Sequence, residues 1–255
     1  MADRQDEIRI VEGEAELSLQ AAEMFAQRAT EAMNRRGRFT VALSGGSTPR
    51  AIHRRLTEAP FRNRIDWDKV EFLWGDERAV APDHEDSNYR MARETLLDRV
   101  PTPPKRIHRM PAEREDLDAA AREYQAEIAS ACGVAADGDP PAIDLVLLGM
   151  GPDGHTASLF PHTEVLQPTG RWVVGNYVPK LNTHRMTMTP TLINRAACVV
   201  FVVNGEDKAA PLAEVLEGPP DAERLPSQLI RPSPGELIWL VDRHAAAKLN
   251  QRAIG

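Results

Sequence analysis

Six short apolar runs, rich in β-branched residues, alternate along the chain with amphipathic stretches. Within each run the apolar positions are nearly continuous, a pattern typical of strands covered on both faces of a parallel sheet. We therefore predict buried strands at residues 39–43, 70–74, 143–148, 172–174, 199–203 and 237–241.

Helical periodicity fills several of the intervals between these runs. The pattern predicts helices over residues 14–34, 88–99 and 116–131, and Gly37 and Gly133 follow the first and the third of them, where a glycine commonly ends a helix. The alternation of strands and helices predicts an α/β fold with a mainly parallel sheet. The proline-rich segments fall between periodic stretches and indicate loops. We expect a single α/β domain over residues 1–255, with a small excursion around residues 101–111.

Composition narrows the class of protein. The 255 residues are 42% hydrophobic and 27% charged with a formal net charge of −7, which is typical of a globular chain large enough to hold a core without disulfides or a structural metal. The two cysteines, Cys132 and Cys198, have no metal-ligand spacing, so we expect no metal and a reducing cytoplasm.

The sequence also lacks the patterns typical of a membrane span, a signal peptide or a nucleic-acid-binding surface. No apolar run approaches ~18 residues, and the first residues are polar and acidic, so we expect neither a membrane span nor a signal peptide. The charges are dispersed and the pI is near 5.6, whereas nucleic-acid binding needs clustered basic residues. We therefore predict no nucleic acid and no membrane among the partners.

A glycine- and hydroxyl-rich segment follows the strand at residues 39–43. In parallel sheets, ligands bind beyond the carboxyl ends of the strands, where helix N-termini also point. Glycines let backbone N–H groups approach an anion, and Thr48 and Pro49 suit the N-cap and first position of a helix. We predict a phosphate cradle here, with a plain capped turn as the alternative; its residues are Ser44, Gly45, Gly46, Ser47 and Thr48.

Charged residues follow the strand at residues 70–74. Asp76, Glu77 and Arg78 could serve acid–base chemistry or hold an anion. A solvated charged turn is the alternative interpretation.

The segment after residues 143–148 matches G-x-G-x-x-G. A dinucleotide fingerprint should open a helix and be followed by an acidic residue at the end of the next strand. Here Pro152 and Pro161 bracket the segment and the next predicted strand runs into glycine and asparagine. We therefore predict no nicotinamide cofactor. The loop instead presents the carboxylate of Asp153 and the imidazole of His155, for which a purely structural histidine is the alternative.

Three cations, Lys180, Arg185 and Lys208, follow the later strands. Lys208 lies at a predicted helix start, where the helix dipole disfavours a positive charge, so an anionic ligand would explain it. Lys180 and Arg185 follow Val178. A solvated lysine is the alternative for Lys208.

Three segments together resemble the 6-phosphogluconolactonases of the glucosamine-6-phosphate isomerase/6-phosphogluconolactonase family: residues 43–49, residues 74–78 with 87–89, and residues 149–161. The resemblance implies a doubly wound, mainly parallel sheet with helices on both faces, a Rossmann-like three-layer sandwich. It also implies hydrolysis of 6-phosphoglucono-δ-lactone in the oxidative pentose phosphate pathway, by a cytoplasmic enzyme without a cofactor. A lactone is a reactive ester, so a positioned water can attack it without a covalent serine, and no G-x-S-x-G is present.

The resemblance implies roles for the residues singled out above. Ser44, Gly45, Gly46, Ser47 and Thr48 would hold the phosphate with Arg185 and Lys208. His155 would be the general base, since an imidazole with an ordinary pKa of ~6.5 suits neutral operation. Asp76 or Glu77 would orient the histidine or the sugar hydroxyls, and Arg78 would stabilise the oxyanion or contact phosphate. We expect further substrate contacts from Gly151, Asp153 and Gly154.

Two other functions stay open. The related deaminases continue their glycine-rich loop as G-H-I-A-F-N-E-P, whereas residues 154–161 here lack the Asn-Glu pair. The related sugar-phosphate sensors carry an N-terminal helix-turn-helix, for which we expect no room before the predicted strand at residue 39. For the lactonase interpretation, the expected partner is the small sugar-phosphate lactone, and we expect the protein to be a monomer or weak homo-oligomer.

Overall fold

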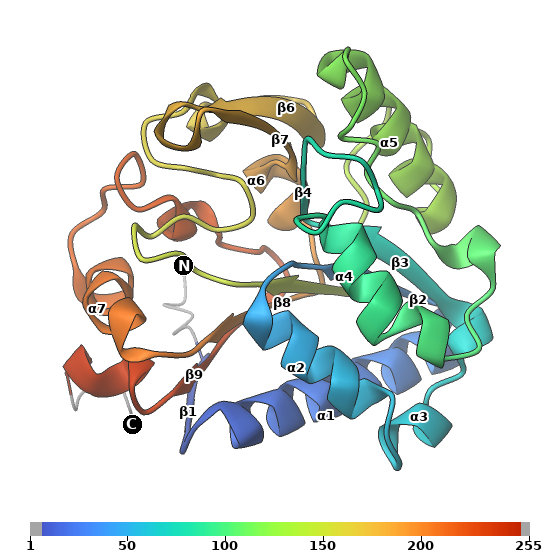
Figure 1. Cartoon of the computed structure of the whole chain (residues 1–255), viewed down its shortest axis with the longest axis horizontal. Helices are drawn as coiled ribbons and strands as arrows, with labels where there is room; N and C mark the ends of the chain where they lie inside the picture. Colours follow the sequence, from blue (N-terminus) through green and yellow to red (C-terminus); the bar gives the residue numbers. More distant parts are fainter. Residues whose placement is uncertain (1–6, 251–255) are drawn as a thin grey trace.

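A six-stranded parallel sheet forms the centre of the computed structural model, which describes residues 7–250 (Figure 1). The strand order is β1-β9-β8-β5-β2-β3, and every neighbouring pair is parallel. The strands are β1 (Glu7–Val11), β2 (Phe39–Leu43), β3 (Val70–Trp74), β5 (Leu145–Leu148), β8 (Cys198–Val203) and β9 (Glu236–Asp242). Four of them, β2, β3, β5 and β8, are buried along their whole length, which explains their continuous apolar sequences.

A second, antiparallel sheet contains β4 (Asp76–Arg78), β7 (Thr183–Met188) and β6 (Val173–Val178), in that order. The strand predicted at residues 172–174 is the start of β6, so its expected place in the parallel sheet is wrong. Burial along β6 is interrupted by exposed positions, because this sheet is not enclosed on both faces. A tight turn joins β6 to β7 and uses Asn182 in the left-handed region (φ 47°).

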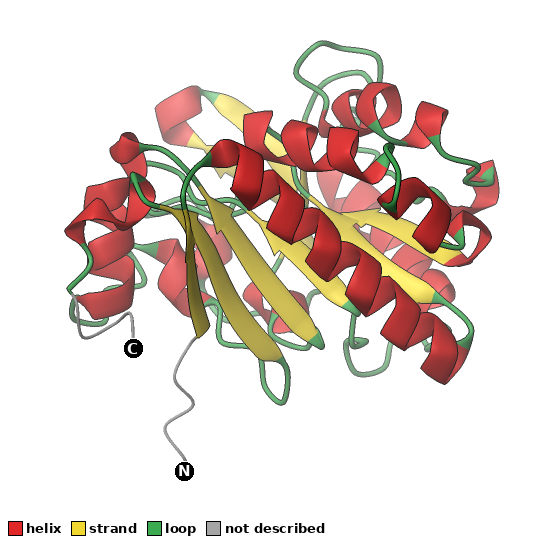
Figure 2. Cartoon of the chain, turned by 90° about the horizontal axis from the view of Figure 1, so that it is seen from below, coloured by secondary structure: helices red, strands yellow, loops and turns green. Residues whose placement is uncertain are grey.

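Seven α-helices of the described chain surround the sheets: α1 (Glu14–Arg36), α2 (Ser47–Leu56), α3 (Phe61–Arg64), α4 (Asn88–Thr95), α5 (Leu117–Cys132), α6 (Pro190–Ile193) and α7 (Ala209–Glu217). Helix α1 packs on β2 and β9, and α5 packs on β6. In Figure 2 α1 crosses in front of the large sheet, and the small sheet lies behind it. The expected α/β architecture is therefore confirmed.

The three predicted helices are present, with altered ends. Gly37 and Gly133 adopt the left-handed conformation (φ 73° and 67°) and end α1 and α5 as predicted. Helix α4 stops at Thr95 and is followed by a 3₁₀ turn at Leu97–Arg99, so it is shorter than predicted. No helix between residues 7 and 250 has the length and apolar character needed to cross a membrane.

The strand order places a switch point between β2 and β5. Strand β3 lies on one side of β2, whereas β5, β8 and β9 follow on the other side. Loops that leave β2 and β5 in opposite directions open a crevice beyond the carboxyl ends of these two strands. The site predicted from the sequence falls at this crevice, because residues 44–48 follow β2 and residues 149–155 follow β5.

Candidate active site

A cavity of about 450 Å³ lies at the carboxyl ends of β2, β5 and β8. Residues 44–49, the start of the loop after β5, and residues 204, 205, 207 and 208 line it, so the structure brings Lys208 to the predicted phosphate cradle. Helix α2 begins at Ser47 on the cavity wall, after Gly46 with a φ of 112° that favours glycine. The first N–H groups of a helix have no carbonyl partner within it, and the helix dipole is positive there. The cavity is therefore suited to an anion.

Thr48 has a different role from the predicted N-cap. The helix begins one residue before it, and the Thr48 hydroxyl donates a hydrogen bond to Asn204 Oδ1 (2.7 Å) across the cavity wall. The N-cap prediction is therefore wrong. Asn204 was not singled out from the sequence, although its place directly after β8 was a usable signal.

Gly45 is required by the close approach of Asn88 from α4. A Cβ atom at Gly45 would lie 1.7 Å from Asn88 Oδ1. The Asn88 amide Nδ2 donates to the backbone oxygen of Asp76 (2.9 Å) and approaches its carboxylate (3.3 Å). Asn88 Oδ1 is buried and has no hydrogen-bond partner among residues 7–250. Asn88 thus connects the glycine loop to β4, a contact that the sequence did not reveal.

Lys208 is held at the cavity by a neighbouring carboxylate. Its Nζ lies 2.5 Å from Asp207 Oδ2, in the 3₁₀ turn Glu206–Lys208 that leads into α7. The Lys208 side chain is 20% exposed, against 62% for Asp207. The ammonium group therefore faces a partly closed space, while its carboxylate partner is open to solvent.

Asp153 and His155 form a pair on the loop after β5. His155 Nδ1 lies 2.5 Å from Asp153 Oδ1, and Lys180 Nζ donates to Asp153 Oδ2 (3.0 Å). Burial opposes ionisation of Asp153, but the hydrogen bond and charge of His155 and the hydrogen bond from Lys180 outweigh it, so the pKa of Asp153 lies well below its ordinary value. The carboxylate is therefore ionised at neutral pH.

Two glycines allow the turn that carries this pair. The Gly151 N–H donates to the His155 carbonyl (2.8 Å), and the Gly154 N–H donates to the Gly151 carbonyl (3.0 Å). A Cβ atom at Gly151 would lie 2.1 Å from the His155 ring, and one at Gly154, where φ is 73°, would lie 2.6 Å from Leu225. The glycine pattern that resembles a dinucleotide fingerprint is thus explained by close packing around the imidazole.

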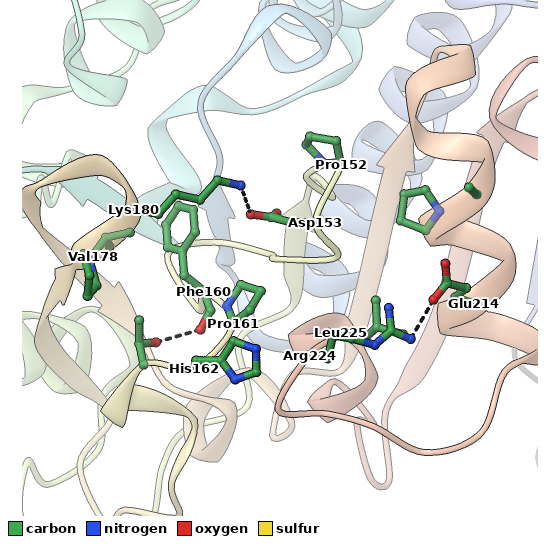
Figure 3. A pocket seen from close by; sticks show the side chains of 14 residues that line it. Pro152, Asp153, Phe160, Pro161, His162, Val178, Lys180, Glu214, Arg224 and Leu225 are labelled. Atoms are coloured by element: carbon green, nitrogen blue, oxygen red, sulfur yellow. Dashed lines mark hydrogen bonds and ion pairs between the residues drawn. The ribbon is translucent and has the colours of Figure 1, made fainter.

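A second cavity, of about 590 Å³, is lined by Asp153, the carboxylate partner of His155 (Figure 3). Asp153, Phe160 and Lys180 belong to its wall, together with apolar residues such as Val178 and Leu225. Figure 3 shows Lys180 reaching from the end of β6 toward Asp153 on the facing loop.

Asp76 and Glu77 do not contact His155. The Asp76 carboxylate accepts a hydrogen bond from Ser158 Oγ (2.6 Å) and so supports the segment after His155. Glu77 faces the start of α4, where its two oxygens accept from the backbone N–H groups of residues 78, 88 and 89 (2.8 Å each) and from Ser87 Oγ (3.2 Å). Burial raises the pKa of Glu77 although these N–H groups oppose the shift. Both carboxylate oxygens of Glu77 thus accept hydrogen bonds from residues 78 and 87–89.

Arg78 and Arg185 lie opposite each other in the β4–β7 ladder. Arg78 Nη1 donates to the carbonyl of Asp86 (2.5 Å), whereas the half-buried Arg185 guanidinium has no hydrogen bond or ion pair with any residue from 7 to 250. Burial and the adjacent charge of Arg78 lower the pKa of Arg185. Neither arginine lines the 450 Å³ cavity, so the structure does not group Arg185 with Lys208. Neither guanidinium forms an ion pair with a carboxylate of residues 7–250, although the charges of Asp76, Glu77 and Asp86 act on Arg185. The two neighbouring cations nevertheless favour an anion.

These features define a class of protein: an α/β protein with a cavity suited to an anion at its topological switch point and a carboxylate-supported imidazole on the loop after β5. Between residues 7 and 250 no group of three or more His, Cys, Asp or Glu side chains is arranged to hold a metal ion. The chain belongs to the family of glucosamine-6-phosphate isomerases and 6-phosphogluconolactonases, whose model matches residues 12–239.

Several relatives of this chain are named as lactonases. The chain is 42% identical over 244 residues to a 6-phosphogluconolactonase from Nostoc, covering 95% of this chain and 98% of the relative. It is 46% identical over 223 residues to one from Synechocystis, covering 87% and 89%. The structure of 6-phosphogluconolactonase from Trypanosoma cruzi superposes with a TM-score of 0.84 at 28% identity, covering 96% and 97%.

The fold extends to the other branch of the family as well. A monomeric glucosamine-6-phosphate deaminase superposes with a TM-score of 0.78, covering 95% of this chain and 99% of the deaminase. At 22% identity this likeness shows a common fold and nothing about activity.

Proposed function

We propose that this chain hydrolyses 6-phosphoglucono-δ-lactone to 6-phosphogluconate. The observation that carries the proposal is the loop after β5, which contributes Gly149 and Met150 to the anion cavity and, a few residues later, the Asp153–His155 pair. The same loop thus lines the cavity that would bind the phosphate and carries the histidine that would deprotonate water. The lactonase names of relatives at 42% and 46% identity support the same substrate.

The phosphate would bind in the cradle at the start of α2. Backbone N–H groups of residues 47 and 48 and the hydroxyls of Ser44 and Ser47 supply neutral donors, and Lys208 supplies the charge. Charge-assisted contacts contribute roughly 1.5–3 kcal/mol each. The net charge of −7 does not oppose binding, because charges beyond roughly 8 Å are screened at physiological salt.

His155 would act as general base toward water. Its Nδ1–H donates to the ionised Asp153, which leaves the Nε2 lone pair free to accept a proton. As Nε2 takes a proton from water, the oxygen attacks the lactone carbonyl carbon and the C=O electrons move to oxygen. When the tetrahedral intermediate collapses, the bond from this carbon to the ring oxygen breaks, and His155 returns the proton to that oxygen. The products are the open-chain acid and a regenerated imidazole.

The negative charge of the tetrahedral intermediate needs donors. Arg78 and Arg185 are our candidates, because they are adjacent cations and Arg185 has no partner within the described residues. Asp76 would hold the loop in place through Ser158, and Glu77 would fix the start of α4. We thus assign the two carboxylates positioning roles and leave acid–base chemistry to His155.

We further propose a cytoplasmic enzyme that is a monomer or weak homo-oligomer with the sugar-phosphate lactone as its partner. The two cysteines are buried and unpaired, which fits a reducing compartment. Sedimentation at several protein concentrations would measure the oligomeric state.

The test is a lactonase assay on freshly oxidised glucose 6-phosphate, corrected for spontaneous hydrolysis. Enzyme-dependent acid release that saturates with substrate supports the proposal. Ammonia release from glucosamine 6-phosphate would point to the deaminase branch instead. Binding of 6-phosphogluconate without turnover of either substrate would indicate a sugar-phosphate sensor.

A further inference from the structure

We propose that Lys180 is a positioning residue for this reaction, which holds Asp153 toward His155 and sets the pH at which the imidazole becomes a free base. The inference rests on the proposed function of His155 as the base. It adds a third member, from a separate element, to the Asp153–His155 pair.

The geometry places Lys180 at the far oxygen of the carboxylate. Asp153 Oδ1 faces His155 Nδ1 (2.5 Å), and Asp153 Oδ2 accepts from Lys180 Nζ (3.0 Å). Both oxygens are thereby engaged, one toward the base and one toward the lysine. A carboxylate held at both oxygens cannot rotate about its terminal bond without losing a charge-assisted hydrogen bond.

The two partners come from different parts of the chain. Asp153 lies on the loop after β5, and Lys180 lies on the turn Pro179–Leu181 between β6 and β7. Among residues 7–250, Lys180 is the one hydrogen-bond partner of the Asp153 side chain from outside its own loop. Figure 3 shows the lysine spanning this gap along the wall of the second cavity. The turn between β6 and β7 therefore controls the orientation of a carboxylate that it does not carry.

The electrostatic effect has a defined sign. Asp153 stabilises the protonated imidazole, and the positive charge of Lys180 offsets part of that stabilisation. Without Lys180 the imidazole would keep its proton to a higher pH, and the acid limb of the rate profile would move upward. Because the Lys180 side chain is 68% exposed, solvent screens this effect, and we expect a shift of about half a pH unit.

The other charged groups of this region form no hydrogen bond with the Asp153 side chain among residues 7–250. His162 and Arg224, which line the same cavity, pair with Glu223 (3.5 Å) and Glu214 (2.6 Å). Across the loop, Lys208 pairs with Asp207, and the small sheet carries Asp76, Arg78 and Arg185. None of these groups is changed by a substitution at Lys180, so the same residues surround the pair in every variant compared.

The experiment compares Lys180→Arg, Lys180→Met and Lys180→Glu with the unaltered protein. We would measure kcat/KM on the phosphorylated lactone from pH 5 to pH 7.5. The midpoint of the acid limb should stay unchanged in Lys180→Arg, rise by about half a unit in Lys180→Met, and rise further in Lys180→Glu. Lys69→Met, which removes a surface lysine paired with Asp66 at 2.8 Å, is the matched control and should not move it.

A second measurement separates this inference from the proposed function. Titration of the His155 ring protons by NMR, assigned with His155→Asn, follows the same series without requiring turnover. If the unaltered protein does not hydrolyse the lactone, the proposed function fails, while the NMR midpoints still decide the role of Lys180. Identical midpoints in Lys180→Met and the unaltered protein, or a fall in kcat without any movement of the midpoint, would overturn the inference.

Discussion

Phe160 stacks its ring on the imidazole of His155, with ring centroids 4.1 Å apart and 23° between the planes. Phe160 is buried, and the two residues belong to the same loop. The stacked ring limits rotation of the imidazole, so that Nδ1 stays on Asp153 while Nε2 faces away from it. Packing and hydrogen bonding thus fix the same side chain.

Replacing Phe160 by leucine should therefore reduce kcat about three- to tenfold, because aromatic pairs contribute ~0.5–1.5 kcal/mol beyond their buried area. Leucine keeps the site apolar and limits the loss of stability. Initial rates at saturating lactone would measure the effect. A change in KM alone, with kcat intact, would show that the stack does not act through the imidazole.

His155→Asn should lower kcat by roughly 10²–10⁴-fold, which is the usual contribution of a general base. Product binding, followed by calorimetry with 6-phosphogluconate, should persist. His162→Asn is the matched control, because its ring is 71% exposed on the neighbouring cavity. If His155→Asn keeps more than about a third of the original kcat, the base is another residue.

Lys208→Ala should weaken kcat/KM for the phosphorylated lactone by about one to two decades, since a charge-assisted contact is lost. Hydrolysis of unphosphorylated gluconolactone should change little. The exposed Lys248 provides the control substitution, Lys248→Ala. Equal losses on both lactones would mean that Lys208 acts in catalysis or folding instead of phosphate binding.

Gly45→Ala should be strongly destabilising, because the new Cβ would meet Asn88 Oδ1 at 1.7 Å. In an Asn88→Ala background the obstructing amide is gone, so the same change should cost less than about 1 kcal/mol. Urea unfolding of both single variants and the double variant gives the coupling free energy. Additive losses would refute direct contact as the reason for glycine at this position.

Asp153 should make stability depend on pH. Its pKa is depressed in the folded state, so the ionised carboxylate stabilises the fold above the unfolded pKa of ~3.9. This contribution is lost as pH falls through the folded value. The excess unfolding free energy of the unaltered protein over Asp153→Asn should thus be present at pH 5–7 and shrink below about pH 4. A difference that is constant with pH, measured by urea unfolding, would contradict the assignment.

The sequence predicted the buried parallel strands well, because a strand enclosed on both faces must be apolar throughout. It missed β1, β4 and β7, which are amphipathic or polar. Strand β4 consists of Asp76, Glu77 and Arg78, residues typical of a turn, and it is a strand only because β7 pairs with it. That pairing is a long-range contact with no local signal.

The sequence predicted which loops form the candidate site, but it did not predict the contacts between them. The position after a strand identified residues 44–48, His155 and Lys208, since strand ends converge at one edge of a parallel sheet. The contacts of Asp153 with Lys180 and of Gly45 with Asn88 join distant segments. Only the folded chain defines such contacts, so the division of roles among the carboxylates could not be predicted.

The edge of the large sheet at β1 has a consequence for the order in which the protein can be assembled. Strand β1 is the first strand of the described chain, and its one neighbour in the sheet is β9, the last. During synthesis on the ribosome, β1 therefore emerges long before the strand it pairs with. Four strands of the sheet can align from β3 to β8 in the meantime, and the sheet is completed at this edge only after β9 has left the exit tunnel.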